Sequence, residues 1–475
     1  MLTLVTFTFN AIANFALGLG VAYYLGAQEF GTYALAAAAG TVLQTLFFEW
    51  LRLATNRFYG ERQVAEDPGI VSTLNRGTGA IAALLSVAAL VIYASGGALG
   101  ATALVAAMAP LIAISGGLFD YRTALARACF QHRRYAALVI IKNIAALVLM
   151  LGGALYWCRA DVVLFGLCIS ALAGVAVSAQ FFQEKPGERG KARKELLRQF
   201  MIYSAPLIVA NMIFLANMFM ARSGVALQHG MAESGRYSLA LDIGLKLVAT
   251  VGSGLDILLF QLAVRAEAEQ GADAARTQLA KNLLVIVGVV LPACVGLWLA
   301  LPSFEALFVG ASYRVAFSTY LTLLLPGLFA FALIHYGINP LFQIARRTTP
   351  VIASALVALA ATAAMMFLTP GSDGSHGAIA TSAGFVAGLG MMVLLAWRIA
   401  PIDVPWRELA KVVIGVLAMV LVALPLRSQP GSALMLLATA VTGGGVYGAL
   451  ALAMNIGGIR GALLARLRRL RPAHS

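Results

Sequence analysis

The sequence predicts an all-α polytopic membrane protein with about 14 transmembrane helices. Of its 475 residues, 61% are hydrophobic and only 11% are Asp, Glu, Lys or Arg, whereas a soluble domain carries about 25% charged residues. Apolar stretches long enough to cross a hydrocarbon core of about 30 Å also follow one another along the chain. This composition excludes a soluble enzyme.

Fourteen stretches have the length and apolarity of a membrane-spanning helix. They cover residues 2–24, 31–53, 78–96, 98–118, 136–157, 162–182, 199–221, 236–261, 281–301, 315–336, 350–369, 377–397, 409–426 and 432–454. The first stretch has no basic segment before it and is too long for the apolar core of a signal peptide. We therefore expect it to be retained as a span.

Basic residues alternate between the two sides of this predicted bundle. Most of the 34 Lys and Arg residues fall near the connections that follow even-numbered spans and in the C-terminal tail. Cytoplasmic loops collect Lys and Arg, so both termini are predicted to be cytoplasmic, with charged loops at 119–135 and 262–280. The basic tail is expected to lie on membrane lipids. The net charge of +14 then requires no nucleic acid partner.

An internal repeat links the two halves of the chain. Segment 29–40 reappears 204 residues later as segment 233–244, with six identities in twelve aligned positions. The identical pairs are Glu29 and Glu233, Gly31 and Gly235, Tyr33 and Tyr237, Leu35 and Leu239, Ala36 and Ala240, and Gly40 and Gly244. We expect Gly31 and Gly235 at a turn or helix start, the acidic pair near a helix N-terminus and the tyrosines at the membrane interface.

The repeat predicts two six-helix lobes in the same orientation, because an even number of spans separates its copies. The predicted segments are a first lobe at 1–183, a basic cytoplasmic linker at 184–198, a second lobe at 199–400, two added helices at 401–456 and a basic cytoplasmic tail at 457–475. Such parallel repeats favour a substrate path between the lobes.

Ionisable residues inside a span usually face a cavity or a partner, and the eighth span carries a stripe of them. Asp242, Lys246, Ser253 and Asp256 fall on one helical face. In one interpretation Asp242 and Lys246, four residues apart, only neutralise each other. In the other, Lys246 binds an anionic substrate. Asp242 and Asp256 are also candidates for coupling to a proton or sodium gradient.

Three further spans carry polar faces. Their members are Asn10 and Asn14 in the first span, Gln44, Glu49 and Arg52 in the second, and Asn211 and Arg222 in the seventh. Asparagine either lines a cavity or joins helices, and charges near a helix end either face a cavity or snorkel to the interface. The first, second, seventh and eighth spans are equivalent pairs in the two lobes, so we interpret these residues as one cavity. Glu49 is a third coupling candidate.

No motif points to catalysis. The sequence has no phosphate-binding loop, no zinc-protease motif and no nucleophile elbow. Its four cysteines are scattered without metal-ligand spacing, and no predicted outside connection has room for a catalytic domain. We therefore expect no catalytic residue, no metal and no cofactor, and do not expect an enzyme.

The segment 25–35, LGAQEFGTYAL, resembles the lipid-linked oligosaccharide flippases of O-antigen and exopolysaccharide synthesis. These belong to the multidrug/oligosaccharidyl-lipid/polysaccharide exporter superfamily. The resemblance implies alternating access of a V-shaped cavity and transport of an undecaprenyl-diphosphate-linked oligosaccharide across the bacterial inner membrane. The product would serve O-antigen, exopolysaccharide or capsule synthesis, with a polysaccharide polymerase and co-polymerase as further partners.

A diphosphate needs cationic partners, whereas sugars need amides and hydroxyls. The resemblance thus implies that Arg52, Lys246 and Arg222 bind the diphosphate. The expected sugar-binding residues are Asn10, Asn14, Gln44, Asn211 and Ser253. A proton- or sodium-coupled drug/cation antiporter of the same superfamily is the first alternative. A membrane-embedded polysaccharide polymerase or ligase is the second, and the short outside connections argue against it.

Overall fold

The computed structural model describes most of the chain. The described residues are 2–59, 69–96, 102–181, 191–345, 347–369, 371, 373–399, 401 and 403–461. In these ranges 13 helices are long and apolar enough to cross a membrane. The first of them, Phe9–Phe58, has 50 residues, enough for two spans at 1.5 Å per residue. The predicted all-α membrane fold is confirmed.

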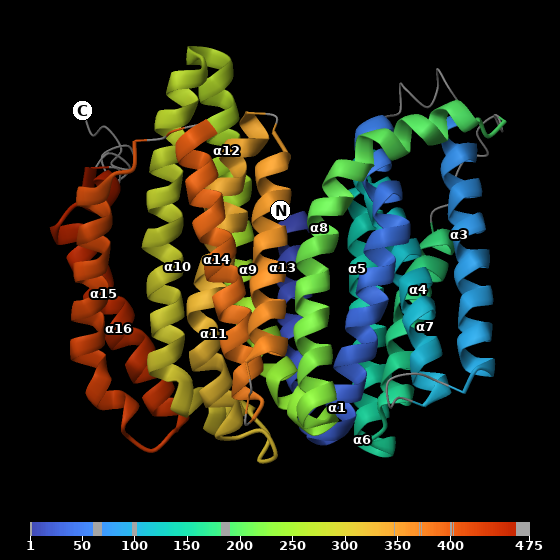
Figure 1. Cartoon of the computed structure of the whole chain (residues 1–475), viewed down its shortest axis with the longest axis horizontal. Coiled ribbons are helices and arrows are strands. Elements are labelled where there is room, and N and C mark those ends of the chain that lie inside the picture. Colours follow the sequence, from blue (N-terminus) through green and yellow to red (C-terminus); the bar gives the residue numbers. More distant parts are fainter. Residues whose placement is uncertain are drawn as a thin grey trace, which may run out of the picture. The chain divides into compact units, whose positions relative to one another are not determined.

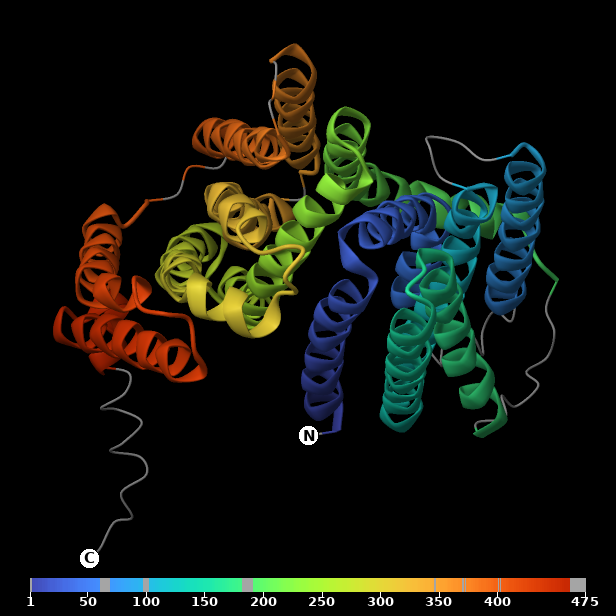
Figure 2. The same ribbon diagram turned by 90° about the horizontal axis from the view of Figure 1, so that it is seen from below.

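Helix α1 (Leu2–Phe58) is two helical segments joined at one residue. Gly26 has φ 72° and ψ 170°, a conformation that glycine adopts far more readily than residues with a side chain. Figure 2 shows the two segments running in different directions from this bend. The expected connection between the first two spans is therefore a single-residue break, and Gly31 lies inside the second segment rather than at a turn.

Contacts divide the chain into two compact units, and the first comprises residues 1–239 with 366–377. Its helices are α1, α3 (Gly69–Ala94), α4 (Ala103–Ala128), α5 (His132–Ala146), α6 (Gly152–Trp157), α7 (Ala160–Phe181) and α8 (Lys194–His229), with a π-helical turn at Leu147–Leu151 (Figure 1). A core cluster that includes Trp50, Leu51, Leu74 and Phe200 packs α1, α3 and α8 together.

The second unit comprises residues 240–365 and 378–475. Most of helix α9 (Met231–Gln270) belongs to it, and its other helices are α10 (Ala272–Phe308), α11 (Ala316–Ala332), α12 (Asn339–Ile344), α13 (Thr349–Leu368, except its last three residues), α14 (Ser375–Ile399, after its first three residues), α15 (Trp406–Arg427) and α16 (Ala433–Ala453). A π-helical turn covers Leu333–Ile338 and a 3₁₀ turn covers Ile456–Gly458. Leu284, Val412 and Val416 form a buried cluster where α10 meets α15.

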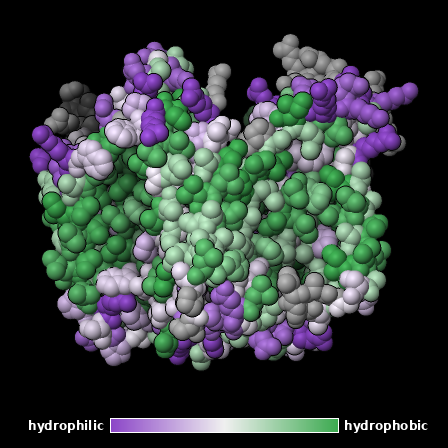
Figure 3. Space-filling view, in the orientation of Figure 1, coloured by the Kyte–Doolittle hydropathy of each residue, from purple (hydrophilic) through white to green (hydrophobic). Residues whose placement is uncertain are grey.

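Apolar side chains cover the outside of both units. Leu90 on α3 is 69% exposed and Leu421 on α15 is 74% exposed. On the face shown in Figure 3, apolar residues occupy the middle of each unit and polar residues gather at its ends. Exposed apolar surface of this extent suits contact with lipid. The chain is a multi-pass membrane protein.

Several predicted loops are helical. Helix α4 continues ten residues beyond the predicted end at 118, so most of the expected loop 119–135 belongs to α4 and α5. The expected loop 262–280 consists of the ends of α9 and α10, which meet at Gly271. Charged residues predicted these loops, yet charged helix ends can extend past the apolar core into water. The predicted linker is helical from Lys194 onward.

The lobe boundaries predicted from the repeat stay a prediction. Residues 184–190 of the linker and 462–475 of the tail lie outside the described residues. The contact-based units are a different division, because α8 packs with α1: Phe200 lies 5.2 Å from Phe58 between ring centroids, and Ser204 Oγ donates to the carbonyl of Trp50.

Some of the repeated residues have the same structural role in both copies of the repeat. A Cβ on Gly40 would lie 2.7 Å from Ile112 on α4, and one on Gly244 would lie 2.3 Å from Leu328 on α11. Both glycines thus allow close helix packing. Tyr237, however, is fully buried, so its expected place at the membrane interface is wrong.

Candidate functional site

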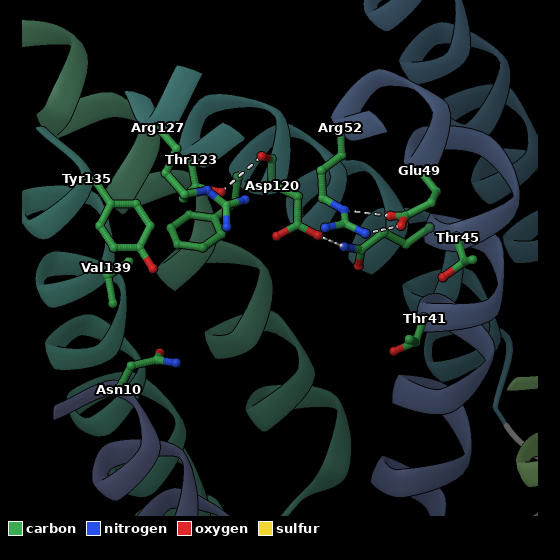
Figure 4. A pocket seen from close by; sticks show the side chains of 12 residues that line it. Asn10, Thr41, Thr45, Glu49, Arg52, Asp120, Thr123, Arg127, Tyr135 and Val139 are labelled. Carbon is green, nitrogen blue, oxygen red and sulfur yellow. Dashed lines mark hydrogen bonds and ion pairs between the residues drawn. The ribbon is translucent and has the colours of Figure 1, made fainter. Parts of the chain in front are cut away.

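A cavity of about 390 Å³ lies within the first unit, between the two segments of α1 and helices α4 and α5. Its lining is mostly polar or charged, and Figure 4 shows the lining side chains. The lining residues are Asn10, Thr41, Gln44, Thr45, Glu49, Arg52, Phe119, Asp120, Thr123, Arg127, Tyr135 and Val139. Such a lining inside an apolar bundle indicates a binding site for a polar group.

Arg52 and Glu49 form an ion pair on the wall supplied by α1. Arg52 Nε donates to Glu49 Oε2 at 3.0 Å, and its Nη2 contacts Glu49 Oε1. The two residues are one helical turn apart, so their side chains lie on the same face. The Arg52 side chain is 34% exposed and that of Glu49 is 12% exposed. The guanidinium therefore keeps access to the cavity while Glu49 fixes its position.

Asp120 faces this pair from α4. Gln44 Nε2 donates to Asp120 Oδ2 at 2.7 Å, and Arg52 attracts the carboxylate electrostatically. In Figure 4, Asp120 lies between Arg52 on one side and Arg127 on the other. Sequence reasoning missed Asp120 because it was assigned to the loop 119–135. The extension of α4 places it in the cavity wall.

Three asparagines join α1 to α5 at another part of the wall. Asn14 Nδ2 and Asn143 Nδ2 each donate to Asn10 Oδ1 at 2.9 Å. Asn143 is fully buried, and its own Oδ1 accepts no hydrogen bond from the residues that the structure describes. Asn10 thus lines the cavity and also joins two helices, whereas Asn14 donates to Asn10 within α1 and does not line the cavity. Asn143 was not singled out from the sequence.

Two cations stack on aromatic rings beside the cavity. Arg127 lies 5.8 Å from the ring centroid of Tyr135, and Lys142 Nζ lies 5.7 Å from that of Phe119. Lys142 also attracts Asp120 electrostatically. Lys142 was missed although it falls inside the predicted span 136–157, where a lysine is a functional signal by itself. The cavity therefore brings cations, carboxylates, amides, hydroxyls and aromatic rings together.

Other predicted site residues lie elsewhere. Lys246, Asp242, Ser253 and Asp256 are half-buried on α9 in the second unit. None of these four lines the 390 Å³ cavity. Their roles stay predictions.

On α8, Asn211 is exposed and Arg222 is buried, with its carbonyl accepting a hydrogen bond from Ser234 Oγ at 3.0 Å. Neither residue lines the 390 Å³ cavity. The structure therefore brings together Asn10, Gln44, Glu49 and Arg52 from the predicted set. It adds Asp120 and the aromatic residues.

The arrangement suits a ligand that is anionic at one end and rich in hydroxyl groups. A guanidinium binds phosphate or carboxylate oxygens through paired N–H donors. Amides and threonine hydroxyls can donate to and accept from sugar hydroxyls. The described residues hold no group of three or more His, Cys, Asp or Glu arranged to bind a metal ion.

Comparison with known proteins rests on structure, because no protein-family model and no curated protein matches the sequence. The lipid II flippase MurJ in an inward closed conformation is 14% identical, with 96% of this chain and 98% of that chain covered and a TM-score of 0.69. An inward-facing multidrug resistance MATE transporter of the MOP superfamily is 15% identical, with 82% and 94% covered and a TM-score of 0.58.

A MOP superfamily transporter from Pyrococcus furiosus, described by the reverse polarity of its binding pocket, is 15% identical over 84% of this chain and 93% of that chain, with a TM-score of 0.51. At such identities the likeness shows architecture. The chain has the fold of the lipid II flippase MurJ and of the transporters of the MOP superfamily.

Proposed function

We propose that this chain is a flippase that moves an undecaprenyl-diphosphate-linked oligosaccharide across the bacterial inner membrane by alternating access. The observation that carries the proposal is the cavity between α1, α4 and α5, where the Arg52 guanidinium lies among amides and hydroxyls. A headgroup of phosphates and sugars needs this combination of groups. The fold shared with a lipid II flippase supports the same class of substrate.

Two kinds of side chain bind the two parts of the headgroup, the phosphates and the sugars. Arg52 binds a phosphate oxygen, which competes with the Glu49 carboxylate that holds the guanidinium in this structure. Asn10 and Gln44 bind sugar hydroxyls, and the Tyr135 ring offers an apolar face to a sugar. Lys246 and Arg222 are proposed as further phosphate ligands, and Asn14, Asn211 and Ser253 as further sugar ligands.

Coupling to a proton or sodium gradient is part of the proposal. Glu49 is the candidate within the cavity, because a phosphate on Arg52 leaves its carboxylate without its cation, and Asp120 lies nearby. Asp242 and Asp256 on α9 are the other candidates. A polysaccharide polymerase and co-polymerase would take the product on the far side of the membrane.

A drug or cation antiporter is the second candidate, and one observation favours it. Glu49 and Asp120 place two carboxylates on the same cavity, which is what a cationic substrate requires. The fold is shared with a multidrug transporter as well. The flippase is preferred because Arg52, Arg127 and Lys142 place three cations at or beside this cavity.

Deletion of the gene separates the two candidates. A flippase predicts loss of the surface glycan and accumulation of a complete lipid-linked repeat unit that remains on the cytoplasmic face. An antiporter predicts normal glycan and increased sensitivity to cationic drugs. Complementation with Arg52→Ala should fail to restore the glycan, whereas Arg265→Ala should restore it. Arg265 is a matched control because its side chain is 75% exposed and it pairs with Glu269 outside the cavity.

A further inference from the structure

A second cavity lies within the first unit, between the last residues of α8 and the end of α13. Its volume is about 480 Å³, within the range of about 300–1,000 Å³ that is usual for small-molecule sites. Gln228 and His229 line it from α8, and Met366, Phe367 and Leu368 line it from α13, with Thr369 just beyond. All of these residues belong to the first unit. We refer to this space as the His229 cavity.

The His229 cavity lies at the other end of the first unit from Arg52. Phe58, six residues after Arg52, packs on Phe200 at the start of α8, with 5.2 Å between the ring centroids. His229 follows Phe200 by 29 residues, which is about 44 Å of helix, and Figure 1 shows α8 running along the unit. The predicted topology places this end outside the cytoplasm.

The two cavities of the first unit differ in charge. The cavity around Arg52 is lined by two carboxylates and two guanidinium groups. Among the described residues that line the His229 cavity, none is Asp, Glu, Lys or Arg. A diphosphate needs cationic partners, so it does not suit the His229 cavity. This cavity suits an uncharged ligand.

Two polar side chains of α8 are available to such a ligand. The Nε2 atom of His229 is buried, and no residue that the structure describes forms a hydrogen bond with it. A buried polar atom without a partner is unfavourable, so a ligand hydroxyl that reaches this nitrogen would be bound. Gln228 Nε2 donates to the carbonyl of Met366 at 2.8 Å, and its Oε1 can accept from a ligand. An amide beside an imidazole suits the hydroxyl groups of a sugar.

The end of α13 adds an apolar surface and a fixed backbone. Phe367 is 56% exposed, and the electron-rich face of an aromatic ring attracts the C–H groups of a sugar. Thr369 Oγ1 lies 3.3 Å from His376 Nε2, which is hydrogen-bonding distance. A Cβ on Gly371 would lie 2.5 Å from the His376 ring, so glycine allows the chain to lie against the imidazole. His376 thus positions the segment that carries Thr369.

We propose that the His229 cavity is a second binding site, which holds an uncharged sugar of the transported glycan at the end of the first unit opposite Arg52. His229 Nε2 and Gln228 Oε1 bind its hydroxyl groups, and Phe367 packs on its C–H groups. The diphosphate binds in the cavity around Arg52 instead. The role of this site in transport rests on the function proposed above, whereas the binding of a sugar does not.

Saturation-transfer NMR on the full chain in lipid nanodiscs tests the site without transport. Nanodiscs avoid detergents that carry sugar headgroups. The probes are the methyl glycosides of glucose, galactose, mannose, rhamnose and N-acetylglucosamine, and at least one should bind. His229→Phe should raise the Kd of that glycoside about tenfold, the effect of one lost hydrogen bond. Phenylalanine keeps a ring of similar size and removes the unpartnered nitrogen, so the free energy of unfolding should not fall.

Two more variants make the test specific. Phe367→Ala should raise the Kd about 2- to 10-fold, and it should fold because this side chain is 56% exposed. His132→Phe is the matched control: His132 is an exposed histidine at the start of α5 and does not line the His229 cavity. This control should leave the Kd unchanged.

The site and the flippase fail in different ways. An unchanged Kd in both His229→Phe and Phe367→Ala would overturn the site, and so would the absence of binding for every probe. Neither result bears on deletion of the gene, which tests the flippase separately. Normal surface glycan after deletion, together with a sugar bound at His229, would overturn the role in transport and support the binding site alone.

Discussion

Replacing Arg52 by Gln tests whether the cavity binds an anionic headgroup. The guanidinium makes a 3.0 Å hydrogen bond from Nε to Glu49 and a second contact through Nη2. Glutamine keeps hydrogen-bonding capacity at that place but removes the positive charge. Two consequences follow: Glu49 loses its cation, and a bound phosphate loses its guanidinium.

The two consequences have different magnitudes. Breaking a buried ion pair by removing one partner costs about 3–5 kcal/mol, and the Arg52 side chain is 34% exposed, so we expect a loss of about 1–3 kcal/mol in the free energy of unfolding. A hydrogen bond to a charged group contributes about 1.5–3 kcal/mol. At 1.4 kcal/mol per factor of ten, the Kd for the headgroup should rise about 10- to 150-fold.

The double variant Glu49→Gln/Arg52→Gln separates the two effects. It removes both charges, so the free energy of unfolding should recover, while binding should remain as weak as in Arg52→Gln. Thermal unfolding in detergent gives the stability, and titration with undecaprenyl diphosphate gives the affinity. Full recovery of binding in the double variant would refute the reasoning, because Arg52 would then serve only to neutralise Glu49.

Three further predictions concern single residues. Lys246→Ala should abolish glycan export without lowering the protein level, and unchanged surface polysaccharide would remove Lys246 from the mechanism. Gly40→Ala should cost about 1–3 kcal/mol in the free energy of unfolding through overpacking, because the added Cβ would lie 2.7 Å from a side-chain carbon of α4; Gly79→Ala, where the space is open, is the control in the same thermal unfolding measurement. Glu29→Ala should cost about 0.5–2 kcal/mol, because Glu29 accepts from the first N–H of α7 at 2.8 Å; hydrogen exchange of the first turn of α7 should rise, and an unchanged rate would contradict this role.

The fold could be predicted from the sequence because a membrane restricts the choices. A span must be an apolar helix of a known length, so composition alone defines the class. The repeat copies at Glu29 and Glu233 predicted two related halves, which stays a prediction. The sequence did not predict the break at Gly26. It favoured a turn or helix start at Gly31, because Gly31 belongs to the repeated segment. Both residues are glycines, and residue identity alone does not show which of them adopts a positive φ.

The sequence grouped only those cavity residues that lie on one face of the same helix. Gln44, Glu49 and Arg52 lie close together on one helix, so helical spacing was sufficient to group them. Asp120 and Lys142 come from α4 and α5, and their place beside Arg52 depends on how these helices pack, which no periodicity encodes. Charge misled the prediction for Asp120, since a charged stretch was read as a loop.

The single-residue bend in α1 has a consequence for how the protein is made. With no loop at Gly26, the first two spans cannot enter the bilayer as independent segments joined by a flexible tether. They should leave the ribosome and insert together as a preformed hairpin, and an epitope or reporter placed between them would split that hairpin. Topology mapping of this protein should therefore use the connections farther along the chain.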